Sequence, residues 1–217
     1  MALDNKNNIS VGKSHYQDSS FRQLTGRAEY IDDIPLSENT LHGALILSEI
    51  PYGMITSIET EKAKKFDPSI TVITAKDIPG RNDIAPIFAD EPIFAEKEVT
   101  YVGQPIGLIV ASSMERARAA VNEVKIVYKK HKTPILDLDL AFKKKNFFLK
   151  PIHFERGKAN KQIKQAPHKL KGSFSMGGQD HFYLETHIAL AIPHENSEFT
   201  IWSSTQHPVS YTHLRAH

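Results

Sequence analysis

The sequence predicts a mixed α/β (α+β) domain followed by the beginning of a second, β-rich unit. Short β-branched runs alternate with one well-marked helix in the first 133 residues, and a hairpin pattern returns after residue 167. A lysine-rich stretch without apolar periodicity separates them, as is typical of a connection. Because two strands do not form a stable domain alone, we expect the chain to hold only the start of its second domain.

Elements of the first domain follow from local chemistry. We expect strands over Leu41–Leu47, Ile55–Glu59, Ile70–Thr74, Val99–Val102 and Ile106–Ala111. Ile70–Thr74 is β-branched throughout, which favours a buried strand. Glu61–Phe66 is predicted to be helical and to end before Asp67-Pro68, because the residue before a proline avoids the helical conformation.

The strongest helix signal begins at Ser112. Glu115 follows three residues later, which is the spacing of a capping box. An apolar face then recurs at helical spacing, formed by Ala117, Ala120, Val121 and Val124. Lys125–Tyr128 returns as a strand, so the pattern predicts a helix of about three turns packed on a mixed sheet.

The second half carries weaker signals. Residues 134–166 read as a solvated linker, in which the Lys143–Lys145 run is a solvated charge cluster rather than a binding site. β-character then returns in Leu170–Ser175, Asp180–Ile192 and Phe199–Ser203, with a turn at His194–Ser197. The last two runs predict a hairpin.

Gly177–His187 (GGQDHFYLETH) is the densest polar cluster in the chain. In a strand, Gln179, His181, Tyr183, Glu185 and His187 would share one face. His181 and Glu185 would then lie about 13 Å apart, too far to ligate one metal ion. Two interpretations stay open: a row of hydrogen-bonding groups facing a polar cleft, or polar groups satisfied inside a large fold.

Composition excludes several classes of function. The net charge of +2 argues against a dedicated nucleic-acid-binding protein. The absence of cysteine excludes disulfides, cysteine-ligated clusters and a cysteine nucleophile in this chain. No targeting signal and no apolar stretch of membrane-spanning length is present, so we expect a cytoplasmic protein without a membrane partner.

Three local patterns suggest chemistry but have simpler explanations. Gly103-Gln104-Pro105 lacks phosphate-loop spacing, and its proline removes an amide donor, so a tight turn is expected. Ser203-Ser204-Thr205 lacks the GxSxG context of a serine hydrolase and reads as a loop. Asp32-Asp33, just before Pro35, is typical of a turn rather than of a paired-carboxylate site.

Several segments together resemble one family. LTGRAEYIDDIP (Leu24–Pro35), ITAKDIPG (Ile73–Gly80), VTYVGQPIGLIVA (Val99–Ala111), GGQDHFYLET (Gly177–Thr186) and SSTQHP (Ser203–Pro208) occur in the order seen in xanthine dehydrogenases and aldehyde oxidases. The resemblance implies an α/β hammerhead domain followed by the truncated start of a molybdopterin-binding domain. The implied boundaries are a flexible lead-in over 1–19, the hammerhead over 20–133, a linker over 134–166, the start of the cofactor domain over 167–208, and a non-native tail over 209–217.

The resemblance also implies a reaction. Family members hydroxylate a purine or an aldehyde with water-derived oxygen at a molybdenum–molybdopterin centre, and electrons leave through iron–sulfur clusters and FAD to NAD. The resemblance implies that the clusters and FAD lie on a partner subunit or domain, in a hetero-oligomer, and the absence of cysteine is consistent with clusters held elsewhere. A xanthine dehydrogenase-type enzyme is the leading hypothesis, with the fragment alone inactive. An aldehyde oxidase-type enzyme and a non-catalytic hammerhead interaction module are the alternatives.

The resemblance implies few site residues in this chain. Gln206 matches the glutamine whose side chain approaches the molybdenum oxo group without ligating the metal. Gln179 and His181 match a segment near the cofactor. The family's catalytic glutamate and substrate-orienting arginine have no match here, so we assign no catalytic residue.

Overall fold

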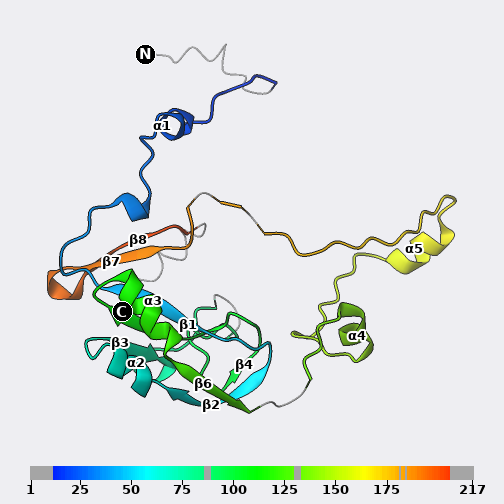
Figure 1. Cartoon of the computed structure of the whole chain (residues 1–217). Coiled ribbons are helices and arrows are strands. Elements are labelled where there is room, and N and C mark those ends of the chain that lie inside the picture. The colour runs from blue at the N-terminus through cyan, green and yellow to red at the C-terminus, as the bar shows by residue number, and fades with distance from the viewer. Residues whose placement is uncertain (1–11, 86–88, 130–132, 181, 184, 206–217) are drawn as a thin grey trace. The chain divides into compact units, whose positions relative to one another are not determined.

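The computed structural model describes residues 12–85, 89–129, 133–180, 182–183 and 185–205. The chain divides into two compact units (Figure 1). Residues 38–177 form one, here called the sheet unit, and residues 1–37 with 178–217 form the other, called the hairpin unit. Within the described ranges, no helix is long and apolar enough to cross a lipid bilayer.

Two three-stranded sheets make up the framework of the sheet unit, with strand orders β1-β5-β3 and β4-β2-β6 (Figure 1). Their strands are β1 (His42–Leu47), β2 (Gly53–Glu59), β3 (Thr71–Thr74), β4 (Glu98–Val99), β5 (Pro105–Ala111) and β6 (Lys125–Lys129). Every pairing among these strands is antiparallel, so the predicted mixed sheet is wrong. The reason is topological: the helix after β5 leads to a strand of the other sheet, not to a parallel neighbour in the same one.

Most predicted strands are confirmed, with two corrections. The predicted buried strand Ile70–Thr74 is confirmed in part: Ile70 is buried, but β3 begins at Thr71, which is exposed, and its other residues are half-buried at the edge of the described sheet. The predicted strand Val99–Val102 is also wrong beyond Val99. The amide of Thr100 donates to Oε1 of Gln104 at 2.7 Å, and Gly103 turns the chain with φ of +84°.

This turn confirms the structural interpretation of Gly103-Gln104-Pro105. The amide of Gly103 donates to the Ser48 carbonyl at 2.7 Å, and the amide of Ser48 donates to the Gln104 carbonyl at 2.9 Å. Gln104 is itself buried. The amide of Gly103 is therefore used within the fold, where a phosphate-binding loop would need it free.

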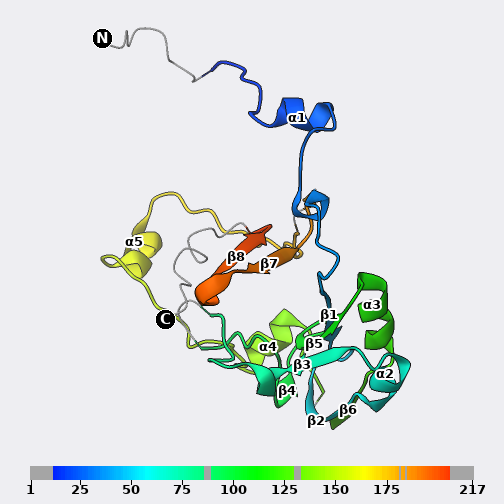
Figure 2. The same cartoon turned by 90° about the vertical axis from the view of Figure 1, so that its left-hand side faces the viewer.

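Two helices pack beside each other, α2 (Glu61–Phe66) and α3 (Met114–Asn122) (Figure 2). The bounds of α2 agree with the prediction. The predicted cap of α3 is wrong by one residue: Ser113, not Ser112, accepts the amide of Arg116, at 3.3 Å. The pKa of Glu115 in the first turn is lowered, first by its own amide and then by the Ser113 hydroxyl.

Small side chains bring α3 close to β1 and β5. Ala117 and Ala120 are fully buried, and Val121 and Val124 pack against the same core, which confirms the predicted apolar face. Beneath them lie Ile106 and Ile109 of β5, also fully buried. Gly107 follows Ile106 along β5. Only glycine fits at this position, because a Cβ atom would lie 2.7 Å from the carbonyl oxygen of Ile73 in β3.

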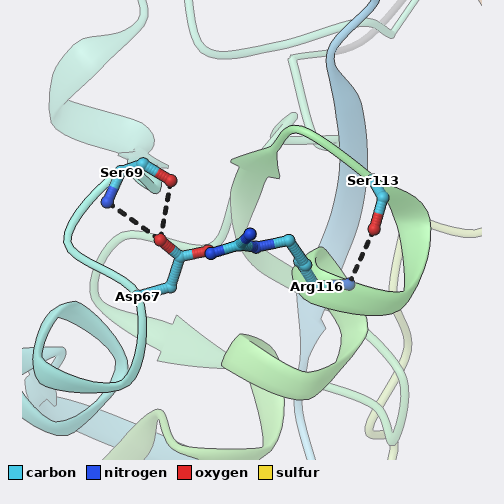
Figure 3. A network of polar contacts seen from close by, with 4 residues as sticks. All are labelled: Asp67, Ser69, Ser113 and Arg116. Atoms are coloured by element: carbon cyan, nitrogen blue, oxygen red, sulfur yellow. Dashed lines mark hydrogen bonds and ion pairs between the residues drawn. The ribbon is translucent and has the colours of Figure 1, made fainter.

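A buried carboxylate joins the end of α2 to α3 (Figure 3). Asp67, 2% exposed, accepts a hydrogen bond from Nε of Arg116 at 2.7 Å. Its other oxygen accepts from the amide and hydroxyl of Ser69, at 3.0 and 2.6 Å. The Arg116 hydrogen bond is the largest cause that lowers the pKa of Asp67 to about 2, followed by the Ser69 hydroxyl and amide.

The stretch expected to be a featureless linker contains two short helices, α4 (Leu138–Lys143) and α5 (Ala159–Gln165). Asp137 caps α4 by accepting the Leu140 amide at 2.7 Å. Leu170–Ser175, predicted to be β-like, forms no strand. Isolated extended residues need a neighbouring strand for their amides, and this segment pairs with none of the described residues.

The hairpin unit consists of two segments distant in sequence. Its described elements are α1 (Ser20–Leu24), η1 (Ile31–Asp33), β7 (Ala189–Pro193), η3 (Glu195–Ser197) and β8 (Phe199–Ser203). β7 and β8 pair antiparallel from Ala189↔Ser203 to Pro193↔Phe199, which confirms the hairpin and its turn. The strand predicted over Asp180–Ile192 is much shorter than expected, since pairing begins only near its end.

The core of the sheet unit yields a stability prediction. Ile109→Ala should lower the free energy of unfolding by about 2–5 kcal/mol, because it removes a fully buried side chain and leaves a cavity. Val102→Ala, at a position 61% exposed, should change it by at most about 0.5 kcal/mol. Urea unfolding of both variants makes the comparison. Equal losses would contradict this assignment of the core.

The Asp67 network yields a pH prediction. Its folded pKa of about 2 lies below the ordinary 3.8, so its contribution to stability is complete above pH 3.8 and is lost as the pH falls towards 2. Asp67→Asn should therefore lower the urea midpoint at pH 6, and the gap from the unmodified chain should narrow below pH 3.8. Asp90→Asn, at an exposed carboxylate, is the matched control. A gap for Asp67→Asn that is constant with pH would refute this role.

Candidate functional site

The polar segment Gly177–His187 is not the strand that alternation predicts. Its described residues, which exclude 181 and 184, form no strand or helix. The Tyr183 hydroxyl lies 2.7 Å from Nε2 of His187, and the two rings meet edge to face with centroids 5.2 Å apart. Side chains four residues apart on a strand would be separated by about 13 Å. Tyr183 and His187 are therefore not spaced as on an extended strand, which contradicts the predicted strand at these two residues, while His181 lies outside the described residues.

Glu185 ties this segment to the beginning of the chain. Its Oε1 accepts a hydrogen bond from the amide of Ile31 at 2.9 Å, across 154 residues of sequence. Ile31 is 9% exposed and opens the turn η1. A carboxylate that accepts a backbone amide makes one of the stronger hydrogen bonds in proteins. Sequence reasoning placed Glu185 on a polar face but gave no sign of this partner.

Asp32-Asp33 forms the turn that presents the Ile31 amide. Oδ2 of Asp33 accepts the amide of Tyr30 at 2.9 Å, and the Ile34 amide donates to the Ile31 carbonyl at 3.2 Å. This confirms the turn expected from sequence.

Ser204 joins two further pieces of backbone. Its hydroxyl donates to the Thr186 carbonyl at 2.7 Å and accepts the amide of Ile188 at 3.0 Å. The amide of Ser204 also donates to the Ile188 carbonyl at 3.2 Å, which extends the β7–β8 pairing by one step. Ser204 was expected to be an ordinary loop residue. It instead connects SSTQHP to the end of GGQDHFYLET.

Of the three predicted site residues, the structure describes Gln179 alone. Gln179 is exposed and lies in an irregular segment. His181 and Gln206 lie outside the described residues. Described parts of three of the five motif segments nevertheless meet in the hairpin unit: Glu185 accepts the Ile31 amide, and Ser204 donates to the Thr186 carbonyl. The other two, Ile73–Gly80 and Val99–Ala111, belong to the sheet unit, and the second supplies the core residues Val99, Ile106, Ile109 and Ala111.

A separate hollow of about 260 Å³ lies in the sheet unit, between β1, α3 and β6. Glu49, Lys125 and Tyr128 are among its lining residues. The hydroxyl of Tyr128 is buried and has no hydrogen-bond partner among the described residues. None of the predicted site residues lines this hollow.

Comparison with known proteins places both halves of the chain. Residues 25–132 match the family model "Aldehyde oxidase and xanthine dehydrogenase, a/b hammerhead domain", and residues 141–217 match "Molybdopterin cofactor-binding domain". The chain belongs to the xanthine dehydrogenase and aldehyde oxidase family. This confirms the predicted fold, a hammerhead domain followed by part of a molybdopterin-binding domain.

Individual relatives agree with this assignment. Xanthine dehydrogenase/oxidase of Gallus gallus is 40% identical over 91% of this chain, and xanthine dehydrogenase of Calliphora vicina is 37% identical over 95%. The chain spans only 14% and 15% of their respective lengths. Quinoline 2-oxidoreductase of Pseudomonas putida 86 shares the fold, with a TM-score of 0.73 at 23% identity, over 90% of this chain and 27% of its own.

The hairpin unit offers polar groups rather than a cluster of metal ligands. Within the described ranges, no group of three or more His, Asp or Glu residues could hold a metal ion. Gln179 offers an exposed carboxamide that both donates and accepts. A Cβ at Gly178 would meet no atom within 4 Å, so its backbone is open to close approach.

Proposed function

We propose that this chain is part of a xanthine dehydrogenase-type molybdenum hydroxylase that oxidises hypoxanthine and xanthine towards urate. The observation that carries the proposal is the meeting of three family-specific segments in the hairpin unit, through Glu185 and Ser204. Relatives named xanthine dehydrogenase, at 37–40% identity, favour a purine over an aldehyde as substrate. The polypeptide alone is proposed to be inactive.

The molybdenum–molybdopterin centre supplies the two-electron oxidation when it is bound. This chain's residues would hold and orient it: Gln179 would offer a neutral carboxamide, and Gln206 would donate a hydrogen bond without adding charge. His181 is proposed to lie near the same cofactor. Because the chain has no cysteine, the iron–sulfur clusters and FAD belong elsewhere in a cytoplasmic hetero-oligomer, with NAD as acceptor.

The proposed activity can be tested with the complete complex that contains this chain. Xanthine, hypoxanthine and an aromatic aldehyde are supplied in ¹⁸O-labelled water with NAD. We expect labelled urate from the purines, NADH formation and about one molybdenum per chain. Preferential labelling of the carboxylic acid from the aldehyde would support the aldehyde oxidase-type alternative. A complex that contains no molybdenum would support the other alternative, in which the chain is a non-catalytic hammerhead interaction module.

Gln206 can be tested in the same complex. Gln206→Ala should lower turnover per bound molybdenum about 10²–10³-fold, if loss of a preorganised donor here resembles loss of an oxyanion-hole donor. Gln179→Ala, which removes a carboxamide proposed to hold the cofactor, should mainly lower cofactor content. Dividing rate by molybdenum separates lost chemistry from lost cofactor. Unchanged turnover per molybdenum in Gln206→Ala would remove Gln206 from the site.

A further inference from the structure

We propose that α4 and the turn that follows it form a docking surface for a protein partner within the complete complex, and that the partner presents an apolar pocket rimmed by carboxylates (Figure 1). The surface comprises residues 137–150 and is here called the aromatic turn. Phe142 and Phe147 form its apolar part, and Lys143–Lys145 lie between them in the sequence. This inference goes beyond the proposed reaction and does not depend on it.

The two phenylalanines are exposed, yet they hold each other in place. Their rings meet edge to face, with centroids 5.9 Å apart. Phe142 is 71% exposed and Phe147 is 46% exposed, and neither belongs to the buried core of the sheet unit. Aromatic pairs of this geometry attract each other beyond the effect of burial. Exposed aromatic side chains are typical of protein interfaces, where they often contribute most of the affinity.

Backbone hydrogen bonds hold this arrangement before any partner binds. The amide of Lys145 donates to the Phe142 carbonyl at 3.0 Å, and the amide of Asn146 donates to the Ala141 carbonyl at 2.9 Å. This is the pattern of a Schellman motif, in which one residue with positive φ ends the helix. Glycine is usual there, but Lys145 takes the position with φ of +53°. The motif fixes the turn that leads to Phe147, so the surface needs little further ordering on binding.

Unpaired positive charge lies next to the aromatic pair. Lys143, Lys144 and Lys145 are exposed, and within the described part of the chain no carboxylate forms an ion pair with them. They are solvated in this structure, as the sequence predicts. Lys150 is also exposed and has no ion pair of this kind. A partner that covers the rings brings its rim close to these ammonium groups, so carboxylates there are favoured.

A lipid surface also attracts apolar and basic groups together, but the observations favour a protein. Helix α4 has only 6 residues, whereas a helix that lies in a membrane interface needs an extended apolar face. Asp137 caps this helix and Asp139 lies in its first turn. Their carboxylates would be repelled by anionic headgroups at the same surface.

Cross-linking of the complete complex tests the contact. A carbodiimide joins an amine directly to a carboxylate that touches it. We expect links from Lys143, Lys144 or Lys145 to Asp or Glu residues outside the 217 residues of this chain. Lys125 and Glu59, 3.3 Å apart, should be linked in the same sample and form the internal control. If the control forms but the three lysines give no link, or link only to carboxylates of this chain, the proposal is overturned.

Substitutions show whether the rings carry the contact. Phe142→Ala combined with Phe147→Ala should lower the yield of the lysine links about tenfold, since two interface aromatics are lost. Leucine at both positions keeps an apolar surface and should retain most of the yield. Phe174→Ala is the control, at an exposed ring without an aromatic partner among the described residues. An unchanged yield in the alanine variant, or an equal loss in the control, would contradict the proposal.

Hydroxyl-radical footprinting tests the same surface without any substitution, because it oxidises exposed aromatic rings. The rings of Phe142 and Phe147 should be oxidised several-fold less in the complete complex than in the separate chain. Equal oxidation would overturn the proposal. Sedimentation of the complex with phosphatidylserine vesicles, lost in the double alanine variant, would overturn it in favour of a lipid surface. The proposed reaction is tested separately by labelled urate and stands whichever result is found here.

Discussion

Backbone amides that lack a sheet or helix must find other partners, and this constraint governs the hairpin unit. Described residues between Gly178 and His187 belong to no regular element. Side chains supply the hydrogen bonds that a strand ladder would otherwise provide. Ser204 is hydrogen-bonded to the backbone of Thr186 and Ile188, and Glu185 accepts the amide of Ile31. A few hydrogen bonds thus decide where the most family-specific segment of the chain lies.

The sheet unit obeys a different constraint, that of close packing. The alanines of α3 let the helix approach β1 and β5 closely, and Gly107 of β5 leaves room for the Ile73 carbonyl of the neighbouring β3. Asp67 adds a buried charge that is stabilised because every neighbour bonded to it is a donor. This unit is organised by burial, whereas the segment that bears the proposed site is organised by a few polar contacts.

The difference explains which predictions from the sequence succeeded. Burial leaves a periodic signal, so the apolar face of α3 and the strand Ile106–Ala111 could be recognised locally. The hammerhead and molybdopterin-binding assignments came from motif order, and both family models support them. Capping at Ser113 was missed by one residue because two serines are adjacent and either could cap.

The contacts of the candidate site leave no comparable signal. Alternating polar residues in Gly177–His187 suggested a strand, yet whether a strand forms depends on a neighbour that local sequence does not specify. No spacing rule joins Glu185 to Ile31 across 154 residues. Ser204 is one of several hydroxyl residues in its loop, and only the fold reveals that it bridges two backbone segments.

The most direct test of the central claim is anomalous diffraction at the molybdenum edge from crystals of the complete complex. It would place the metal and the side chain of Gln206 in one map. The claim predicts one molybdenum per chain, with the Gln206 carboxamide nitrogen about 3 Å from an atom bound to the metal. A molybdenum peak distant from Gln206, or no peak in an intact complex, would contradict it.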